Sequence, residues 1–320
     1  MCRPKTLLLK RIAGLVLLGI LLLNVIAYNH AYQFTHFSKS GVRQKPEELS
    51  AFEKFDILLT GIDNPRPNNT VVPEQEYQTV IIQSEELLEG WVVKAKEEVG
   101  VVILFHGYSG NKSGNLRYSQ EFNRLGYSTL LIDFMGSGGS TGNTTTIGFK
   151  EAKDVVASFQ YVAKHFPDKP IVLFGSSMGA VAIMKAVDKE GIDPGKIILE
   201  CPFGTMKATV ENRFAAMGVP AFPFAHLLTF YGGFINGFDA FEHNPVEYAR
   251  SISVPTLMLY GQKDNRVSID EVNSIFENLL GEKELVVFAD SGHENYLINN
   301  SEEWTAEVKD YLQQGKWNNR

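Results

Sequence analysis

Three residues suited to nucleophilic catalysis stand far apart in this sequence, and the first is Ser177. It lies within Gly-Ser-Ser-Met-Gly at 175–179, between apolar runs that predict a buried strand (170–174) and a helix (180–187). A strand, Gly-x-Ser-x-Gly and a helix together predict a sharp turn that exposes the central serine for reaction. The flanking glycines remove side chains that would collide across such a turn. This spacing selects Ser177 as the nucleophile and assigns no catalytic role to Ser176.

A serine hydroxyl reacts only with a base to take its proton, and that base needs a partner that fixes its tautomer. Asp264 follows the predicted strand 254–261, and His293 follows the predicted strand 285–288. Because active-site groups collect beyond the carboxyl ends of parallel strands, we expect both side chains to meet Ser177 there. Glu200 also ends a predicted strand and is the reserve acid.

The oxygen of a tetrahedral intermediate needs backbone donors. We predict the N–H groups of Met178, directly after the nucleophile, and of Tyr108, in the loop after the predicted strand 100–105. His106 precedes this loop and is interpreted as structural. The other histidines are weaker candidates, because they fall in the N-terminal segment, at a helix end or in an insert: His30, His36, His165, His226 and His243.

Strands that alternate with helices predict an α/β fold with a mostly parallel sheet covered on both faces. Continuous apolar runs predict the buried strands, at 100–105, 128–133, 170–174, 196–200, 254–261 and 285–288. Two shorter runs, 79–82 and 90–94, predict an antiparallel edge.

The segment 205–252 is rich in Phe and Pro and is long for a simple crossover between strands. We favour a cap that roofs the active site over a helical crossover in which the aromatic residues only pack together.

Composition excludes several classes of partner. The net charge is −7 over 320 residues, with 44% hydrophobic and 21% charged residues and no basic stripe, which disfavours nucleic acid. The glycine-rich loop 136–142 lacks the motif endings of nucleotide sites. Cys2 and Cys201 give neither a disulfide framework nor metal-ligand spacing. We expect no metal and no cofactor.

Basic residues precede an apolar segment at 12–23 that continues to Tyr28. We favour an uncleaved signal anchor that places the rest of the chain outside the cytoplasm. The alternatives are a signal peptide cleaved after Val25-x-Ala27, which would make the protein secreted, and, less favoured, a buried core helix.

The predicted division of the chain is anchor or signal peptide (1–29), tether and extension (30–74), and catalytic domain (75–320). A helical pattern at 46–55 lies in the extension, and we expect the folded core to lie wholly beyond Glu47.

From about residue 75 the chain resembles an α/β-hydrolase of the monoacylglycerol-lipase and serine-aminopeptidase-like group. The resemblance rests on His106-Gly107-Tyr108, Asp133 with the loop 136–142, the motif at 175–179, Asp264, and Gly292-His293. It implies an eight-stranded, mostly parallel sheet with helices on both faces, and hydrolysis of esters, thioesters or peptides without a cofactor. Glu200-Cys201 and the N-terminal extension depart from the family pattern.

The predicted function is therefore a membrane-tethered serine hydrolase of the carboxylesterase or lipase type, whose substrate is a small acyl ester or a short peptide. A thioesterase on the same triad is one alternative. A serine aminopeptidase is another, and would use an acid of the insert to hold the substrate amine: Glu211, Asp239, Glu242 or Glu247. A non-catalytic binding protein that has kept the fold is the alternative of another class.

Overall fold

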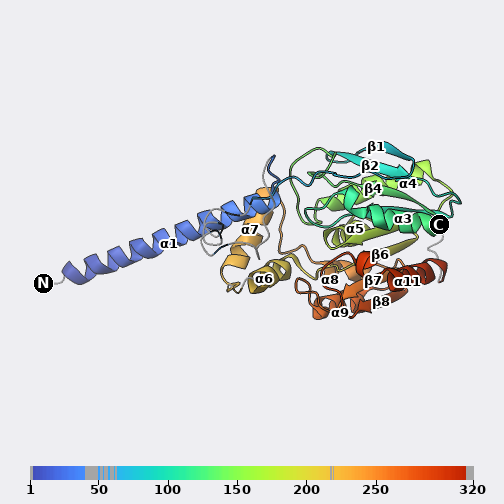
Figure 1. Ribbon diagram of the computed structural model, residues 1–320. Helices are drawn as coiled ribbons and strands as arrows, with labels where there is room; N and C mark the ends of the chain where they lie inside the picture. Colours follow the sequence, from blue (N-terminus) through green and yellow to red (C-terminus); the bar gives the residue numbers. More distant parts are fainter. Residues whose placement is uncertain are drawn as a thin grey trace.

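The computed structural model describes residues 3–39, 50, 53, 57, 61, 63–216, 218 and 220–314. Apart from residues 50 and 53, the helical pattern predicted at 46–55 lies outside the described residues. One eight-stranded sheet, in the order β1-β2-β4-β3-β5-β6-β7-β8, forms the centre of the molecule (Figure 1).

The sheet is antiparallel at one edge and parallel elsewhere, as the sequence predicts. β1 pairs with β2 and β2 with β4 in antiparallel register, and all other pairs are parallel. The strands are β1 (Tyr77–Gln83), β2 (Leu87–Val93), β3 (Gly100–Phe105), β4 (Tyr127–Ile132), β5 (Ile171–Ser176), β6 (Lys196–Glu200), β7 (Thr256–Gly261) and β8 (Lys283–Phe288). From β3 to β7 every strand is buried almost throughout, which explains its continuous apolar sequence.

Helices cover both faces of the sheet and enclose two apolar cores. On one face α4 (Glu151–His165), α5 (Met178–Glu190) and α9 (Ile269–Asn278) contribute to one cluster of buried side chains. On the other face α3 (Leu116–Arg124), α10 (Tyr296–Asn299) and α11 (Ser301–Gln313) contribute to the second, which contains Tyr118, Phe174 and Trp304. Short helices complete the connections: η2 (Lys112–Asn115), α8 (Pro245–Tyr248) and η3 (Ala249–Ser251).

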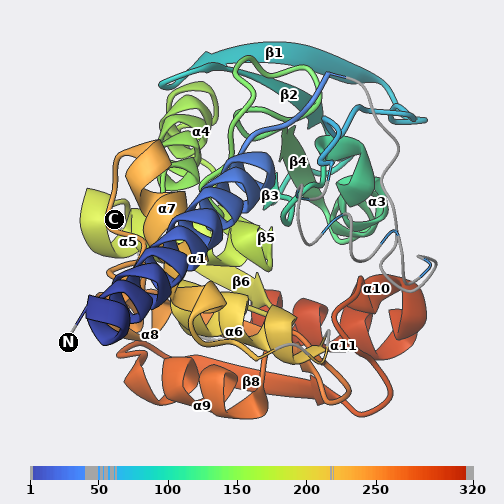
Figure 2. The ribbon, with the colours of Figure 1, turned by 90° about the vertical axis from the view of Figure 1, so that its left-hand side faces the viewer.

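The predicted insert between β6 and β7 is helical. It contains α6 (Met206–Ala216) and α7 (Phe224–Asn236), which contact one another, and α7 lies along α1 (Arg3–Thr35), as Figure 2 shows. α7 carries no Asp, Glu, Lys or Arg, and two of its aromatic side chains, Phe230 and Phe234, are exposed.

Hydrogen bonds with Asp133 and Arg66 fix the glycine-rich loop after β4. The Asp133 carboxylate accepts hydrogen bonds from the backbone N–H groups of Lys112 (2.7 Å) and Gly139 (2.9 Å) and from the Lys112 ammonium. Arg66 donates to the carbonyl oxygens of the loop, among them Gly142 at 2.6 Å. These contacts give the loop an internal structural role.

A single long helix, α1 (Arg3–Thr35), precedes the sheet and extends away from the body of the molecule (Figure 1). Within the described residues, its segment Leu7–Thr35 is the one helix that is long and apolar enough to cross a membrane, with a mean hydropathy of 2.2. The helix continues past residue 29, where the anchor was expected to end.

The last turns of α1 belong to the folded body. They pack along α7, where the Tyr231 hydroxyl donates to Asn24 Oδ1 at 2.8 Å, and Ala27 and Ala31 are buried. Phe37, just after the helix, is buried as well. The expectation that the core lies wholly beyond Glu47 is therefore wrong, because an apolar segment read as an anchor also carries a packing face.

Candidate active site

Ser177 lies on a strained turn between β5 and α5. Its φ of 51° and ψ of −112° are unusual for a residue with a side chain. A Cβ on Gly175 would lie 2.5 Å from the carbonyl carbon of Gly179, and a Cβ on Gly179 would lie 2.5 Å from the Phe105 carbonyl oxygen. Only glycine fits either position, which is the physical reason for the Gly-x-Ser-x-Gly spacing.

The structure brings Ser177, Asp264 and His293 together. His293 Nε2 lies 3.1 Å from Ser177 Oγ, and His293 Nδ1 lies 2.7 Å from Asp264 Oδ2. The Asp264 side chain is buried, and its other oxygen accepts from the N–H groups of Arg266 (2.7 Å) and Val267 (2.9 Å). These bonds fix the carboxylate against the imidazole, an arrangement that orients a histidine as a base.

The loop after β3 lies beside the strained turn that carries Ser177, which we call the elbow. A Cβ on Gly107 would come within 3.6 Å of Ser177 Cβ. His106 is buried, with Nδ1 2.8 Å from the Gly107 carbonyl and Nε2 accepting from the Phe134 N–H at 3.2 Å. Burial lowers the pKa of this imidazole, and both its nitrogens are engaged, which fits the structural role expected for it. Met178 directly follows the nucleophile in the chain, and Gly107, which precedes Tyr108, approaches Ser177 from the loop after β3.

Comparison with known proteins agrees with this architecture. A family model described as Hydrolase_4, serine aminopeptidase S33, matches residues 96–235. The solved structure of the esterase Pf2001 of Pyrococcus furiosus is 25% identical, has a TM-score of 0.67, and covers 78% of this chain and 96% of that chain. The chain has the α/β-hydrolase fold. The resemblance inferred from the motifs is confirmed, and the matches support hydrolase activity.

Two curated relatives are similar to this chain at the sequence level. The uncharacterized protein YqkD of Bacillus subtilis is 24% identical over 228 residues, which are 70% of this chain and 75% of that protein. The human protein ABHD12B is 24% identical over 66% of this chain, and the match spans 60% of its own length.

Glu200 does not take the place of Asp264. Its carboxylate accepts from the Tyr118 hydroxyl at 2.6 Å and from Trp304 Nε1 at 2.8 Å, inside the aromatic core on the far side of β6. Its backbone carbonyl accepts from the Ser177 N–H at 2.8 Å. Glu200 therefore stabilises the turn at Ser177 through its backbone carbonyl, and the geometry favours Asp264 as the partner of His293.

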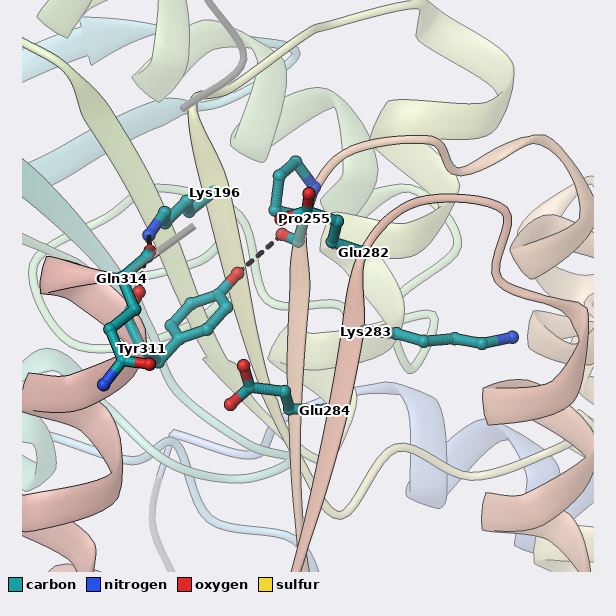
Figure 3. A pocket seen from close by; sticks show the side chains of 7 residues that line it. All are labelled: Lys196, Pro255, Glu282, Lys283, Glu284, Tyr311 and Gln314. Atoms are coloured by element: carbon teal, nitrogen blue, oxygen red, sulfur yellow. Dashed lines mark hydrogen bonds between the residues drawn. The ribbon is translucent and has the colours of Figure 1, made fainter. Parts of the chain in front are cut away.

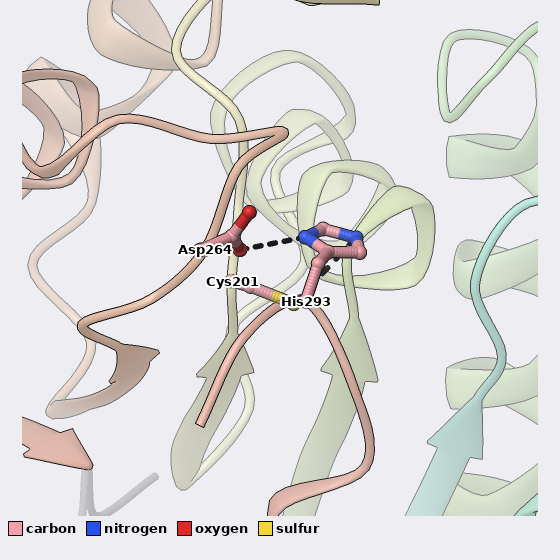
Figure 4. A group of neighbouring side chains, drawn as sticks. All are labelled: Cys201, Asp264 and His293. Atoms are coloured by element: carbon pink, nitrogen blue, oxygen red, sulfur yellow. Dashed lines mark hydrogen bonds and ion pairs between the residues drawn. The ribbon is translucent and has the colours of Figure 1, made fainter. Parts of the chain in front are cut away.

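Cys201 is a neighbour of the site that sequence reasoning did not select. Its buried Sγ lies 4.0 Å from His293 Nε2, and it has a positive φ of 39° (Figure 4). Cys201, Asp264 and His293 are metal-ligating residue types, but the Asp264 carboxylate is already committed to Nδ1 and to two backbone N–H groups. The one signal in the sequence was the departure of the strand-end segment 200–203 from the family pattern, which was noted for its acid, Glu200, and not for Cys201.

Opposing influences act on the pKa of His293. Burial lowers the pKa of the imidazole, whereas Cys201 and the Asp264 carboxylate raise it by more, so the net shift is upward. Asp264 thus favours the protonated imidazole that forms when the base has taken a proton.

Two other polar residues, His243 of the insert and Lys196 at the start of β6, have partners of their own. His243 is buried, with Nδ1 3.0 Å from the Tyr248 hydroxyl and Nε2 3.1 Å from the Ile147 carbonyl, and burial lowers its pKa to about 4. At the amino ends of the strands, Lys196 borders a small pocket and donates to the carbonyl oxygens of Tyr311 and Gln314 (Figure 3). Lys196 begins β6 and therefore lies at the opposite end of the sheet from Ser177, which follows the carboxyl end of β5.

Glu200 generates a prediction about pH and stability. Burial raises the pKa of its carboxyl group from 4.5 to about 7. The folded protein therefore holds this proton more tightly than the unfolded chain, and the free energy of unfolding falls as the pH rises through that interval. We expect Glu200→Gln, whose amide can serve both Tyr118 and Trp304, to lose roughly 3 kcal/mol of this pH dependence.

Urea unfolding of the wild type and of Glu200→Gln between pH 4.5 and 7.5 measures the effect, with the exposed Glu302→Gln as control. Parallel stability curves for all three proteins would show that Glu200 does not carry a raised pKa.

Proposed function

We propose that this chain is a serine hydrolase that cleaves acyl esters through a covalent acyl-enzyme. The observation that carries the proposal is the continuous chain of hydrogen bonds from Ser177 Oγ through His293 to Asp264. The solved esterase of the same fold supports an ester as the substrate class. No member of the chain of bonds is missing, which disfavours a binding protein that has kept only the fold.

In the proposed reaction Ser177 Oγ attacks the acyl carbon while His293 Nε2 takes the hydroxyl proton. The backbone N–H groups of Met178 and Tyr108 stabilise the oxygen of the tetrahedral intermediate. His293 then gives its proton to the leaving alcohol, and the acyl group stays on Ser177. A water molecule, activated by the same imidazole, releases the acid and regenerates the serine.

Three of the four candidate acids of the insert have partners of their own, which disfavours an aminopeptidase. Glu211 pairs with Lys207 at 2.6 Å, and Glu247 pairs with Arg250 at 3.3 Å. Asp239 accepts from the Phe241 N–H at 2.8 Å. A substrate ammonium would have to displace these partners, whereas the uncharged surface of α7 suits an acyl chain. We therefore assign the insert as an acyl-binding cap.

The N-terminal helix is proposed as an uncleaved membrane anchor, with the catalytic domain outside the cytoplasm. Cleavage after Ala27 would sever the segment whose Asn24 bonds to Tyr231 and would remove the buried Ala27 from its packing on α7. This packing favours the anchor over a secreted form.

The nucleophile is tested by paired serine variants. We expect Ser177→Ala to abolish labelling by a fluorophosphonate probe, while Ser176→Ala keeps most of it, since the strained turn presents only Ser177 to His293. Gel-based labelling of the full chain is the measurement. Labelling of Ser177→Ala at the wild-type rate would contradict the assignment.

The acid is tested by Asp264→Asn, which favours the wrong imidazole tautomer. We expect kcat to fall by about 10⁴-fold. Activity requires neutral His293 and so rises with pH through the pKa of this group. Because Asp264 raises that pKa, its loss moves the acidic limb of the pH–rate profile to lower pH. A severe loss of kcat in Glu200→Gln together with near-normal Asp264→Asn would reverse the two roles.

The substrate class is tested with p-nitrophenyl esters from acetate to octanoate beside a matched panel of aminoacyl p-nitroanilides. Each methylene buried in the cap contributes about 0.8 kcal/mol, so kcat/KM is expected to climb with chain length. A flat or falling ester series with efficient aminoacyl cleavage would identify a peptidase.

A further inference from the structure

The last turn of α1 contacts the loop that carries a proposed oxyanion donor. The Phe34 ring stacks on the Tyr108 ring, with centroids 4.7 Å apart and planes inclined by 11°. The Tyr108 hydroxyl donates to the Phe34 carbonyl oxygen at 2.8 Å. The residue that follows Gly107, which itself approaches Ser177, is thus held by the helix proposed as the membrane anchor.

Two further segments hold the same ring. Asn64 Nδ2 donates to the Tyr108 hydroxyl at 3.0 Å and to the Phe34 carbonyl at 3.3 Å. The Arg213 guanidinium of α6 lies 4.5 Å from the Phe34 ring centroid and 5.3 Å from that of Tyr108. The anchor, the extension and the cap therefore converge on Tyr108.

Local sequence explains why this ring needs external support. Gly107 and Gly110 close a turn through a hydrogen bond of 3.0 Å from the Gly110 N–H to the Gly107 carbonyl, and Ser109 within the turn has a φ of 55°. Glycines supply no side chains to hold such a turn, whereas the Tyr108 ring attaches it to α1 and to Asn64. A donor that drifts by about 1 Å from the developing oxyanion costs large factors in rate.

We propose that Phe34, Asn64 and Arg213 form a clamp that positions Tyr108 for oxyanion stabilisation, so that α1 is a working part of the catalytic unit as well as an anchor. The clamp residues act through Tyr108 and are positioning residues. This inference rests on the proposed serine-hydrolase function.

The test uses the full chain in mild detergent with p-nitrophenyl acetate, a substrate too short to need the cap. We expect Phe34→Ala and Tyr108→Phe to lower kcat by about ten- to a hundredfold with little change in KM, when kcat is counted per fluorophosphonate-labelled site. Phe34→Tyr keeps the stacked ring and is expected to keep most of kcat. Leu15→Ala on the exposed part of α1 and Tyr77→Phe on β1 are matched controls that leave kcat unchanged.

Counting per labelled site separates positioning from misfolding, since a protein that merely unfolds loses sites while its remaining sites keep their kcat. Because Phe34 and Tyr108 act on one another, the double variant is expected to lose less than the product of the two single losses. Wild-type kcat per site in both single variants would overturn the clamp alone. Absence of Ser177-dependent labelling in the wild type would instead overturn the proposed function and the clamp together.

Discussion

The strained turn at Ser177 is the constraint on which the rest of the site depends. A positive φ at a residue with a side chain persists only where the surrounding structure over-determines it. Here three features constrain the turn that carries Ser177. The helix α5 begins at Met178, the Phe105 carbonyl leaves no space for a side chain at Gly179, and the Glu200 carbonyl accepts a hydrogen bond from the Ser177 N–H. Three neighbouring strands, β3, β5 and β6, must therefore be in register before Ser177 can be presented.

The parallel sheet places the other two residues of the hydrogen-bonded chain at the same end of the strands as Ser177. Asp264 and His293 follow β7 and β8, whose carboxyl ends open at the same edge as that of β5. Glu200 strengthens the same edge from within, since its carboxylate ties β6 to α3 and α11 through Tyr118 and Trp304.

Sequence reasoning predicted the features that local pattern determines. Continuous apolar runs identified the central strands, and glycine spacing together with the order of Ser177, Asp264 and His293 predicted which side chains the fold brings together. The sequence favoured Asp264 and kept Glu200 only as the reserve acid, since both lie at the ends of strands. The contact of Asp264 with His293, and the packing of Tyr118 and Trp304 around Glu200, separate the two in the structure.

The N-terminal helix shows where pattern fails. An apolar helix that crosses a membrane and one that packs on a protein have the same composition, so the buried face at Ala27 and Ala31 and the contact of Phe34 with Tyr108 left no signal in the sequence. Contacts between residues far apart in the chain depend on how the cap and the helix dock. That docking joins the proposed anchor to the proposed oxyanion loop.

The central claim is that Ser177 forms a covalent acyl-enzyme. The most direct measurement is acid quenching of the full chain during turnover of a p-nitrophenyl ester, followed by mass spectrometry of the proteolytic peptides. The account predicts an acyl group on Ser177 in the peptide that contains the elbow, and none there in Ser177→Ala. An acyl group carried by Cys201 or by Ser176, or turnover with no acylated peptide, would contradict it.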